Sequence, residues 1–401
     1  MSPRLVLFGA GNIGRSFIAQ LFAAAGYEVV FVDINERVVG DLNRRRGYEV
    51  IIRHPDGTDE TVPVTGVRAV SAADEQAVSS EVAEARLAAT AVGAGALPSV
   101  AKLIRAGLLE RRRRRPGEPL DVILAENVRD AAAIVRGVVG EAAQDAEIGL
   151  VQTSIGKMVP IVPSEVTACD PLVVFAEPYN TLIVDAKGFR GELPEVPQIK
   201  AVEDIRAYVD RKLFLHNLGH AAVAYLGHRT DPAVTLIADA LALEPVRGGA
   251  TRAMTESASA LAHAYASLSL TGLHEHRDDL LARFANRALG DTVYRVGRDL
   301  PRKLARDDRL VGAMLLAARA RLPFDGIAEV YLASLGFAAT DEAGDRFPPD
   351  ERIVRLADSD GVEAVLTTVS GLGGDDPVDG RVIAAVLARA EKEVDSGMRD
   401  Q

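Results

Sequence analysis

A glycine-rich turn between a buried strand and a helix is the feature that most constrains the fold of this chain. Residues 4–8 form a short apolar run, which is typical of a strand buried on both faces. The turn Gly9-Ala-Gly-Asn-Ile-Gly14 follows at once, and residues 15–25 predict a helix. Residues 27–32 are apolar again and predict a second buried strand. This order of elements predicts the start of a parallel α/β sheet.

The spacing of the three glycines predicts a site for the pyrophosphate of a dinucleotide. Gly9 permits a tight turn, Gly11 lets the backbone approach a phosphate, and Gly14 lets the helix pack closely on the strand. The free N–H groups at the start of the helix then face the phosphates. Asp33, which closes the second strand, can accept a hydrogen bond from a ribose 2′-hydroxyl and would repel a 2′-phosphate. The pattern therefore favours NAD over NADP, and the alternative is a glycine turn that binds no ligand.

The remainder of the first half alternates strands and helices. Residues 48–54 and 61–65 flank an Asp56-Gly57 turn and predict a β-hairpin inserted in the parallel sheet. Further elements are expected as a helix at 96–115, strands at 120–125 and 147–151, and a strand within 81–93 that ends in Thr90-Ala-Val-Gly93. The fold class is α/β, with a Rossmann-type doubly wound sheet. The candidate cofactor residues are Gly9, Ala10, Gly11, Asn12, Ile13, Gly14, Asp33, Thr90, Val92 and Gly93.

The second half of the chain has a helical character. Alanine and leucine recur at helical spacing within residues 221–226, 233–243, 255–267 and 376–394. A stretch rich in glycine and proline, residues 187–197, is expected to link the halves. We therefore predict a nucleotide-binding domain over residues 1–195 and a mostly helical catalytic domain over residues 196–401.

Composition excludes several classes of protein. The net charge of −11 disfavours nucleic-acid binding, and no run approaches the length of a membrane span. Cys169 is the single cysteine, so no internal disulfide or multi-cysteine metal site can form. The first residues lack the pattern of a signal peptide, and we expect a cytoplasmic protein. A small-molecule substrate is the expected partner, and the protein is expected to be a monomer or a small homo-oligomer.

Two other motifs predict ordinary surface structure. The arginine run Arg111–Arg115 precedes Pro116 and is expected to be the solvated end of a helix. His274-Glu-His276 lacks the helical spacing of a zinc protease motif, so a surface loop is expected and no metal site is predicted.

A polar constellation in the second half suits proton transfer. Lys212, His216, Asn217 and His220 fall on one broad face of a helix drawn at about 100° per residue. Oxidation of an alcohol requires a base for the hydroxyl proton, and a desolvated lysine can serve without a metal. Amide and imidazole groups can hold the reacting oxygen. The alternative is an amphipathic helix with a solvated polar face.

Several segments in order along the chain resemble the polyol-specific long-chain dehydrogenase (mannitol dehydrogenase) family. They are Phe8-Gly-Ala-Gly-Asn-Ile-Gly-Arg15, Thr90-Ala-Val-Gly93, Ala125-Glu-Asn127, Arg211-Lys-Leu-Phe-Leu-His-Asn-Leu-Gly-His-Ala221, Arg295-Val-Gly-Arg298 and Arg302-Lys-Leu304. The spacing Lys-x₄-Asn-x₂-His is distinctive for the family, whereas glycine fingerprints are not.

The resemblance implies a Rossmann domain followed by a helical domain, with the substrate in the cleft between them. It implies metal-independent catalysis in which Lys212 is the general acid/base, Asn217 and His220 bind the reacting oxygen, and Asn127 completes an oxyanion site. Asn127 also follows a predicted strand, at the sheet edge where open α/β sheets bind ligands.

The segment Gly156-Lys157 departs from the family pattern, because relatives usually carry an Asp-Arg pair there. Gly156 lacks a carboxylate expected to touch substrate hydroxyls, and Lys157 presents a point charge instead of a planar guanidinium. His216 replaces a residue that is usually apolar. These changes affect the identity of the polyol rather than the hydride chemistry, and Lys157 stays a candidate substrate residue.

A basic cluster within this acidic chain is a candidate phosphate clamp. Its members are Arg295, Arg298, Arg302 and Lys303. Ordinary ion pairing with nearby aspartates is an equal alternative.

The resemblance favours an NAD-dependent oxidoreductase of a sugar-alcohol phosphate. The default reaction interconverts mannitol 1-phosphate and fructose 6-phosphate. Alternatives with the same chemistry are a cyclitol phosphate, an unphosphorylated polyol or a hexuronate. A non-catalytic NAD-sensing protein is the alternative from another class, and the presence of both Lys212 and Asn127 argues against it.

Overall fold

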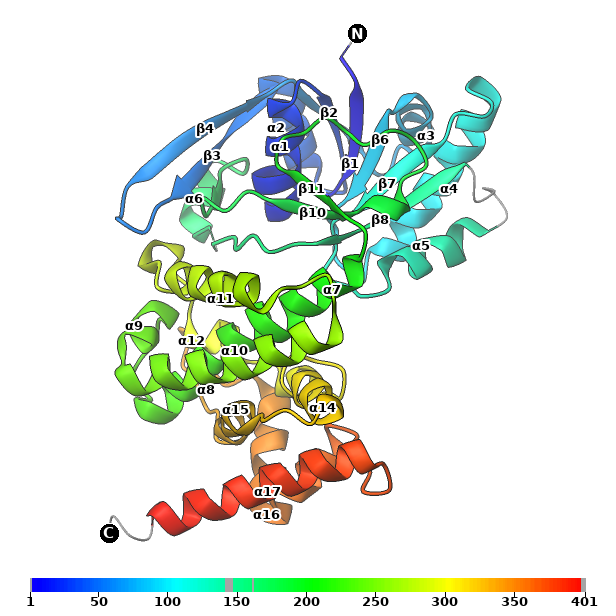
Figure 1. The fold of residues 1–401 in the computed structure, drawn as a ribbon. Coiled ribbons are helices and arrows are strands. Elements are labelled where there is room, and N and C mark those ends of the chain that lie inside the picture. Colours follow the sequence, from blue (N-terminus) through cyan, green and yellow to red (C-terminus); the bar gives the residue numbers. More distant parts are fainter. Residues whose placement is uncertain (1, 141–146, 161, 398–401) are drawn as a thin grey trace. The chain divides into compact units, whose positions relative to one another are not determined.

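The chain divides into two compact units, Met1–Val209 and Asp210–Gln401 (Figure 1). The computed structural model describes residues 2–140, 147–160 and 162–397. The first unit is α/β and the second is almost entirely helical, as predicted. The division falls later than the predicted one after residue 195, because β11 (Ile199–Val202) pairs with β10 (Leu182–Asp185) in the first unit. The predicted link at 187–197 therefore joins two strands of one sheet.

The first unit is built on an eight-stranded sheet in the order β11-β10-β8-β7-β6-β1-β2-β5. From β8 to β5 all neighbouring strands run parallel, and β10 pairs antiparallel with β8. The parallel strands are β1 (Arg4–Phe8), β2 (Glu28–Asp33), β5 (Val67–Ser71), β6 (Leu87–Thr90), β7 (Leu120–Leu124) and β8 (Ile148–Ser154). The strand order reverses at β1, because β2 and β5 lie on one side of it and β6 to β8 on the other. Such a reversal opens a ligand crevice outside the carboxyl ends of the strands.

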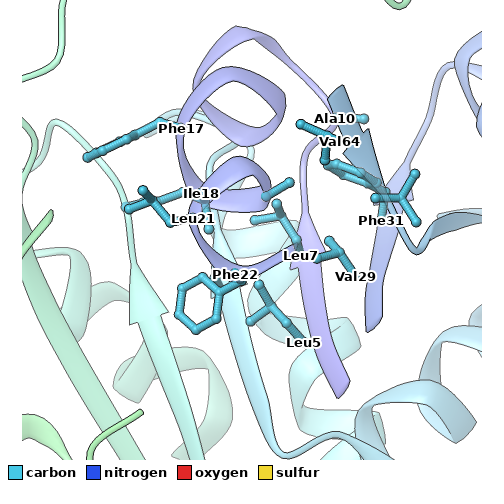
Figure 2. Packing of buried hydrophobic residues seen from close by; sticks show 14 of the residues in the cluster. Leu5, Leu7, Ala10, Phe17, Ile18, Leu21, Phe22, Val29, Phe31 and Val64 are labelled. Carbon is cyan, nitrogen blue, oxygen red and sulfur yellow. The ribbon is translucent and has the colours of Figure 1, made fainter. Parts of the chain in front are cut away.

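Both faces of the sheet are covered, which explains the continuous apolar runs of its strands. Leu5 and Leu7 point to one face and pack with Phe22 and Phe31 (Figure 2). This face is covered by η1 (Gly14–Ala19) and α1 (Gln20–Ala24), and the opposite face by α3 (Glu75–Glu84), α4 (Leu97–Arg114) and α5 (Ala131–Val139). The predicted helix after the glycine turn is thus present, but its first part is π-helical.

The predicted hairpin forms with β3 (Gly47–Arg53) and β4 (Asp59–Thr65). It does not join the parallel sheet. Instead β3 also pairs with β9 (Val174–Ala176), which gives a separate three-stranded sheet in the order β4-β3-β9. Tyr48 and Val50 of the hairpin pack into the same apolar core as β1. The remaining helices of this unit are α2 (Glu36–Arg45), α6 (Ser164–Cys169) and η3 (Ala186–Gly188).

The second unit packs its helices around α10 (Glu244–Ala264), which contacts α8, α11, α14 and α15. The boundary between the units falls within α7 (Ile205–Arg211). The elements that follow it are η4 (Lys212–Asn217), α8 (Leu218–Thr230), α9 (Ile237–Ala242), α10, α11 (Leu270–Phe284), η5 (Arg287–Leu289), α12 (Val293–Gly297), α13 (Leu300–Lys303), α14 (Val311–Ala320), α15 (Asp325–Leu335), α16 (Pro348–Thr368) and α17 (Pro377–Gly397). The expected helix at 255–267 is the second half of the longer α10. Within the described ranges, no helix combines the length and apolar character needed to cross a membrane.

Two surface predictions need correction. The arginine run ends α4 as expected, but Arg111 is 4% exposed rather than solvated. Its guanidinium donates to the carbonyls of Ala83 and Ala85, so it joins α4 to the end of α3. His274-Glu-His276 lies within helix α11, not in a loop. The burial of Arg111 arises from contacts between segments distant in sequence, which local spacing does not reveal.

Candidate functional site

The carboxyl ends of the parallel strands bring most of the N-terminal candidates to one edge of the sheet. The glycine turn follows β1, and Asp33 ends β2. Thr90 ends β6, Asn127 follows β7, and Lys157 follows β8. Because these strands are parallel neighbours, the segments after them meet at the same edge.

The glycine turn has the geometry that each glycine is predicted to supply. Gly9 has a φ of +98°, and a Cβ there would lie 2.4 Å from the carbonyl oxygen of Ala91. A Cβ on Gly14 would lie 2.1 Å from the carbonyl oxygen of Gly9, so helix and turn touch backbone to backbone. Gly11 is exposed and a Cβ there would meet nothing within 4 Å. The turn is therefore closed toward the protein and open toward a ligand, which fits a pyrophosphate cradle.

Asp33 is bound to the glycine turn itself. Its Oδ2 accepts a hydrogen bond from the backbone N–H of Ala10 at 2.6 Å, and its Oδ1 accepts from that of Asn35 at 2.8 Å. Each carboxylate oxygen keeps a second lone pair for a hydroxyl donor. The structure thus places a carboxylate at the turn, where a ribose 2′-hydroxyl can reach it.

Replacement of Asp33 by alanine is expected to lower the preference for NAD over NADP by about tenfold, because it removes both the hydroxyl acceptor and the charge that repels a 2′-phosphate. The ratio of kcat/KM for the two cofactors measures this effect. Asn35→Ala is the matched control, because it removes the side-chain cap on Val38 and keeps the carboxylate. A ratio that Asp33→Ala leaves unchanged would count against the ribose contact.

Glu126 has a role that the sequence analysis does not assign. Its two carboxylate oxygens accept from the backbone N–H groups of Val92 at 2.9 Å and Gly93 at 2.8 Å. The residue is 5% exposed. Glu126 therefore connects the segment after β6, which carries Val92 and Gly93, to the segment after β7, which carries Asn127. It thus holds two groups of candidate residues in place. The signal for Glu126 in the sequence was its position beside Asn127, in a segment that resembles the family.

Lys157 is buried at the end of β8. Its Nζ donates to Oδ1 of Asn180 at 2.9 Å and lies 5.3 Å from the centroid of the Phe17 ring. Phe17 belongs to η1, the helix that follows the glycine turn. Lys157 thus lies beside the predicted cofactor site, and its contact with substrate stays a prediction.

In the second unit, Lys212, His216 and Asn217 lie on the π-helical segment η4 rather than on a regular α-helix. A π-helix closes i→i+5 hydrogen bonds and occurs frequently at functional sites. Asn217 therefore follows Lys212 by one hydrogen-bonded turn, and His220 comes on the next turn, in α8. The wheel drawn at α-helical spacing overestimates the angle between Lys212 and Asn217. His216 is buried, whereas the other three are partly exposed.

Burial, together with the positive charge of Arg309, lowers the pKa of Lys212 to about 8. A lysine with this pKa exchanges its proton near neutral pH, which is what a general acid/base requires. Burial also lowers the pKa of His216 well below its usual range, so His216 is neutral.

His220 lies between an aromatic ring and a carboxylate. Its ring stacks on Phe284 with centroids 4.6 Å apart, and its Nε2 lies 3.1 Å from Oδ2 of Asp291. Burial raises the pKa of Asp291, but His220 and Arg295 outweigh that effect and hold it below its usual value. Asp291 thus orients the imidazole. The sequence analysis does not single out Asp291, because this residue lies far from His220 along the chain.

The predicted phosphate clamp is already engaged in contacts within the second unit. Arg295 pairs with Asp291, and Arg302 pairs with Asp299. Lys303 is buried, donates to the carbonyls of Val296 and Arg298, and has a pKa that burial lowers to about 7. Arg298 is exposed and lies over the rings of Tyr294 and Phe347. Arg298 differs from the other three basic residues, because its described contacts are with aromatic rings rather than with carboxylates or carbonyl groups.

The two halves of the chain each match a family model. The mannitol dehydrogenase Rossmann domain matches residues 3–198, and the mannitol dehydrogenase C-terminal domain matches residues 204–388. The chain belongs to the mannitol dehydrogenase family. This result confirms the resemblance and the fold predicted from the sequence, and it agrees with the predicted oxidoreductase activity and NAD cofactor.

Two solved structures share the fold of this family member. D-sorbitol dehydrogenase in substrate-free form aligns with a TM-score of 0.77 and 19% identity, over 98% of this chain and 94% of that chain. Mannitol 2-dehydrogenase of Pseudomonas fluorescens, in a ternary complex with NAD and D-mannitol, aligns with a TM-score of 0.71 and 17% identity, over 100% of this chain and 93% of that chain.

We expect chelating agents to leave the reaction rate unchanged, because a lysine base and amide donors require no metal. Among the described residues, no three or more His, Cys, Asp or Glu side chains are grouped to hold a metal ion. Initial rates before and after exhaustive chelation test the point. Inhibition that zinc reverses would overturn the metal-independent mechanism.

Proposed function

We propose that this member of the mannitol dehydrogenase family oxidises a secondary alcohol of a sugar-alcohol phosphate with NAD, and catalyses the reverse reduction of the keto sugar phosphate. The observation that carries the proposal is Lys212, a lysine with a pKa near 8 that shares one helical segment with Asn217 and His220. Mannitol 1-phosphate and fructose 6-phosphate are the first pair to test, as for a mannitol-1-phosphate 5-dehydrogenase.

Bound NAD supplies the acceptor for the hydride of the alcohol carbon. Gly9 to Gly14 would hold its pyrophosphate, and Asp33 would accept a hydrogen bond from its ribose. The neutral amine of Lys212 accepts the hydroxyl proton in oxidation, and the ammonium returns it in reduction. Asn127 and Asn217 donate hydrogen bonds to the reacting oxygen, and His220, oriented by Asp291, completes this group.

The phosphate of the substrate is proposed to bind the basic cluster through Arg298. Its guanidinium is exposed and rests on two aromatic rings, which leaves its N–H donors available. Unphosphorylated polyols are the second candidate substrates. The pairing of Arg295 and Arg302 with aspartates favours them, because those charges are already compensated.

A substrate panel tests the proposal. Absorbance of reduced nicotinamide is followed with NAD and mannitol 1-phosphate, other sugar-alcohol phosphates, a cyclitol phosphate, mannitol and sorbitol, and with NADH and hexuronates. We expect the highest kcat/KM with a sugar-alcohol phosphate. Preference for mannitol or sorbitol would support the second candidate. Tight NAD binding without turnover of any compound would indicate an NAD sensor instead.

The pH dependence of the two directions should mirror the titration of Lys212. Because its pKa is near 8, kcat/KM for alcohol oxidation is expected to rise about tenfold per pH unit below pH 8 and to level off above it. Ketone reduction requires the ammonium form and should fall above pH 8. Rates across pH 6 to about 10 check both limbs. Oxidation that is fastest at acid pH would exclude Lys212 as the base.

A further inference from the structure

We propose that Tyr179 determines substrate specificity, by binding a substrate hydroxyl at the carboxyl end of β8. The inference rests on the proposed function and deepens it, because it assigns a residue to the recognition of the polyol. No motif in the sequence singles out Tyr179, and only the packing of two distant segments brings it to the site.

The phenol of Tyr179 lies where a side chain at position 156 would project. A Cβ built on Gly156 would be 3.5 Å from both Cε1 and Oη of Tyr179. Gly156 follows the end of β8 by two residues, and Tyr179 follows the end of β9. Two strands from different sheets therefore deliver one glycine and one tyrosine to the same place.

Hydrogen bonds hold these two segments together on both sides of the tyrosine. Lys157 Nζ donates to Oδ1 of Asn180 at 2.9 Å, and the backbone N–H of Met158 donates to the carboxylate of Glu177. Lys157 and Glu177 are buried, whereas Tyr179 is partly exposed. Hydrogen bonds thus hold the residues on both sides of Tyr179, while the side chain of Tyr179 is partly exposed.

The location is the carboxyl edge of the parallel sheet, where open α/β sheets bind ligands. β8 pairs with β7, and the hydroxyl of Thr153 donates to the carbonyl of Leu124 at 2.8 Å, three residues before Asn127. The segment also touches the cofactor helix, because Lys157 Nζ lies 5.3 Å from the ring centroid of Phe17. Tyr179 therefore lies beside a segment that contacts both the helix after the glycine turn and the end of β7, which leads to Asn127.

The chemistry of a phenol suits an anionic polyol. A phenol hydroxyl both donates and accepts a hydrogen bond and carries no charge below its usual pKa of about 10. An aspartate at position 156 would only accept and would repel a phosphate. The combination of Gly156 and Tyr179 therefore keeps a hydroxyl contact and removes the repulsion, which favours a sugar-alcohol phosphate.

Tyr179→Phe tests the inference because it removes one hydroxyl and nothing else. With the best substrate of the panel, kcat/KM is expected to fall about tenfold, the typical effect of a substrate hydroxyl left without its partner. The same measurement is made with single-deoxy analogues of that substrate, one for each carbon. The loss should vanish on the analogue that lacks the contacted hydroxyl, a result that a merely structural role of Tyr179 would not produce.

Tyr27→Phe is the matched control, because Tyr27 lies before the amino end of β2, at the opposite edge of the sheet. It should leave every kcat/KM unchanged, and both variants should keep the dissociation constant of NAD and the melting temperature. Equal activity of Tyr179→Phe and wild type on the parent substrate, or an equal loss on every analogue, would overturn the inference alone. A wild-type protein that turns over no compound would overturn the proposed function, and the inference with it.

Discussion

Lys212→Ala should lower turnover by about 10²- to 10⁴-fold, the range that a positioned general acid/base contributes. The physical reason is that no other group of η4 can exchange a proton near neutral pH. Burial lowers the pKa of Lys212 to about 8, and it holds the neighbouring His216 in its neutral form. Single-turnover rates with saturating NAD and substrate measure the loss. The dissociation constant of NAD should stay nearly unchanged, because the glycine turn lies on the other unit.

Lys212→Arg separates a proton carrier from a fixed positive charge. Arginine keeps the charge but does not release its proton at these pH values, so it should be as inactive as alanine. Lys187→Ala is the control, because the amine of this exposed lysine pairs with Glu203 in the first unit, and the variant should retain full activity. Substantial turnover by Lys212→Ala, or recovery by Lys212→Arg, would remove Lys212 from the role of base.

Gly14→Ala is the second change with a large expected effect. The new Cβ would lie 2.1 Å from the carbonyl oxygen of Gly9, a backbone atom that cannot move aside without opening the turn. We expect the affinity for NAD to fall by about 100-fold or more, since the N–H groups that face the pyrophosphate lose their alignment. Titration of NAD by calorimetry measures the loss, and the melting temperature should fall as well.

Gly11→Ala distinguishes the ligand cradle from the packing of the turn. A Cβ there meets no protein atom within 4 Å, so the melting temperature should match that of the wild type. The affinity for NAD should still fall, by about tenfold, because the methyl group occupies the approach of the pyrophosphate. Gly137→Ala, also in open space on α5, should change neither quantity. Unchanged NAD binding by Gly11→Ala would show that the phosphates do not approach this backbone.

The glycine turn was predictable because its physics is local. A strand buried on both faces, three glycines and a helix follow each other without a break, and the φ of +98° at Gly9 agrees with the turn expected there. The hairpin was predictable for the same reason, since the Asp56-Gly57 turn connects its strands directly. The sequence did not predict that the hairpin belongs to a separate sheet, because the third strand of that sheet, β9, lies more than a hundred residues further along the chain.

The sequence was sufficient to select η4 as the proposed catalytic segment, but not to predict its π-helical geometry. The spacing of Lys212, Asn217 and His220 was sufficient to indicate the family, yet nothing in it indicates a π-helix. The same holds for Asp291, which reaches His220 only after the helices of the second unit pack together.

The sequence by itself determined the nucleotide-binding unit, the helical unit and the family, since these depend on neighbouring residues and on their spacing. The tertiary structure alone decided that Arg111 is buried, that Glu126 holds the segment after β6, and that Tyr179 faces Gly156. Each of these contacts joins segments that lie at least twenty residues apart, and the partners of Arg111 and Glu126 are backbone groups that carry no side-chain signal. Only the packing of the folded chain selects such partners, because burial makes an unpaired charge or hydrogen-bonding group costly.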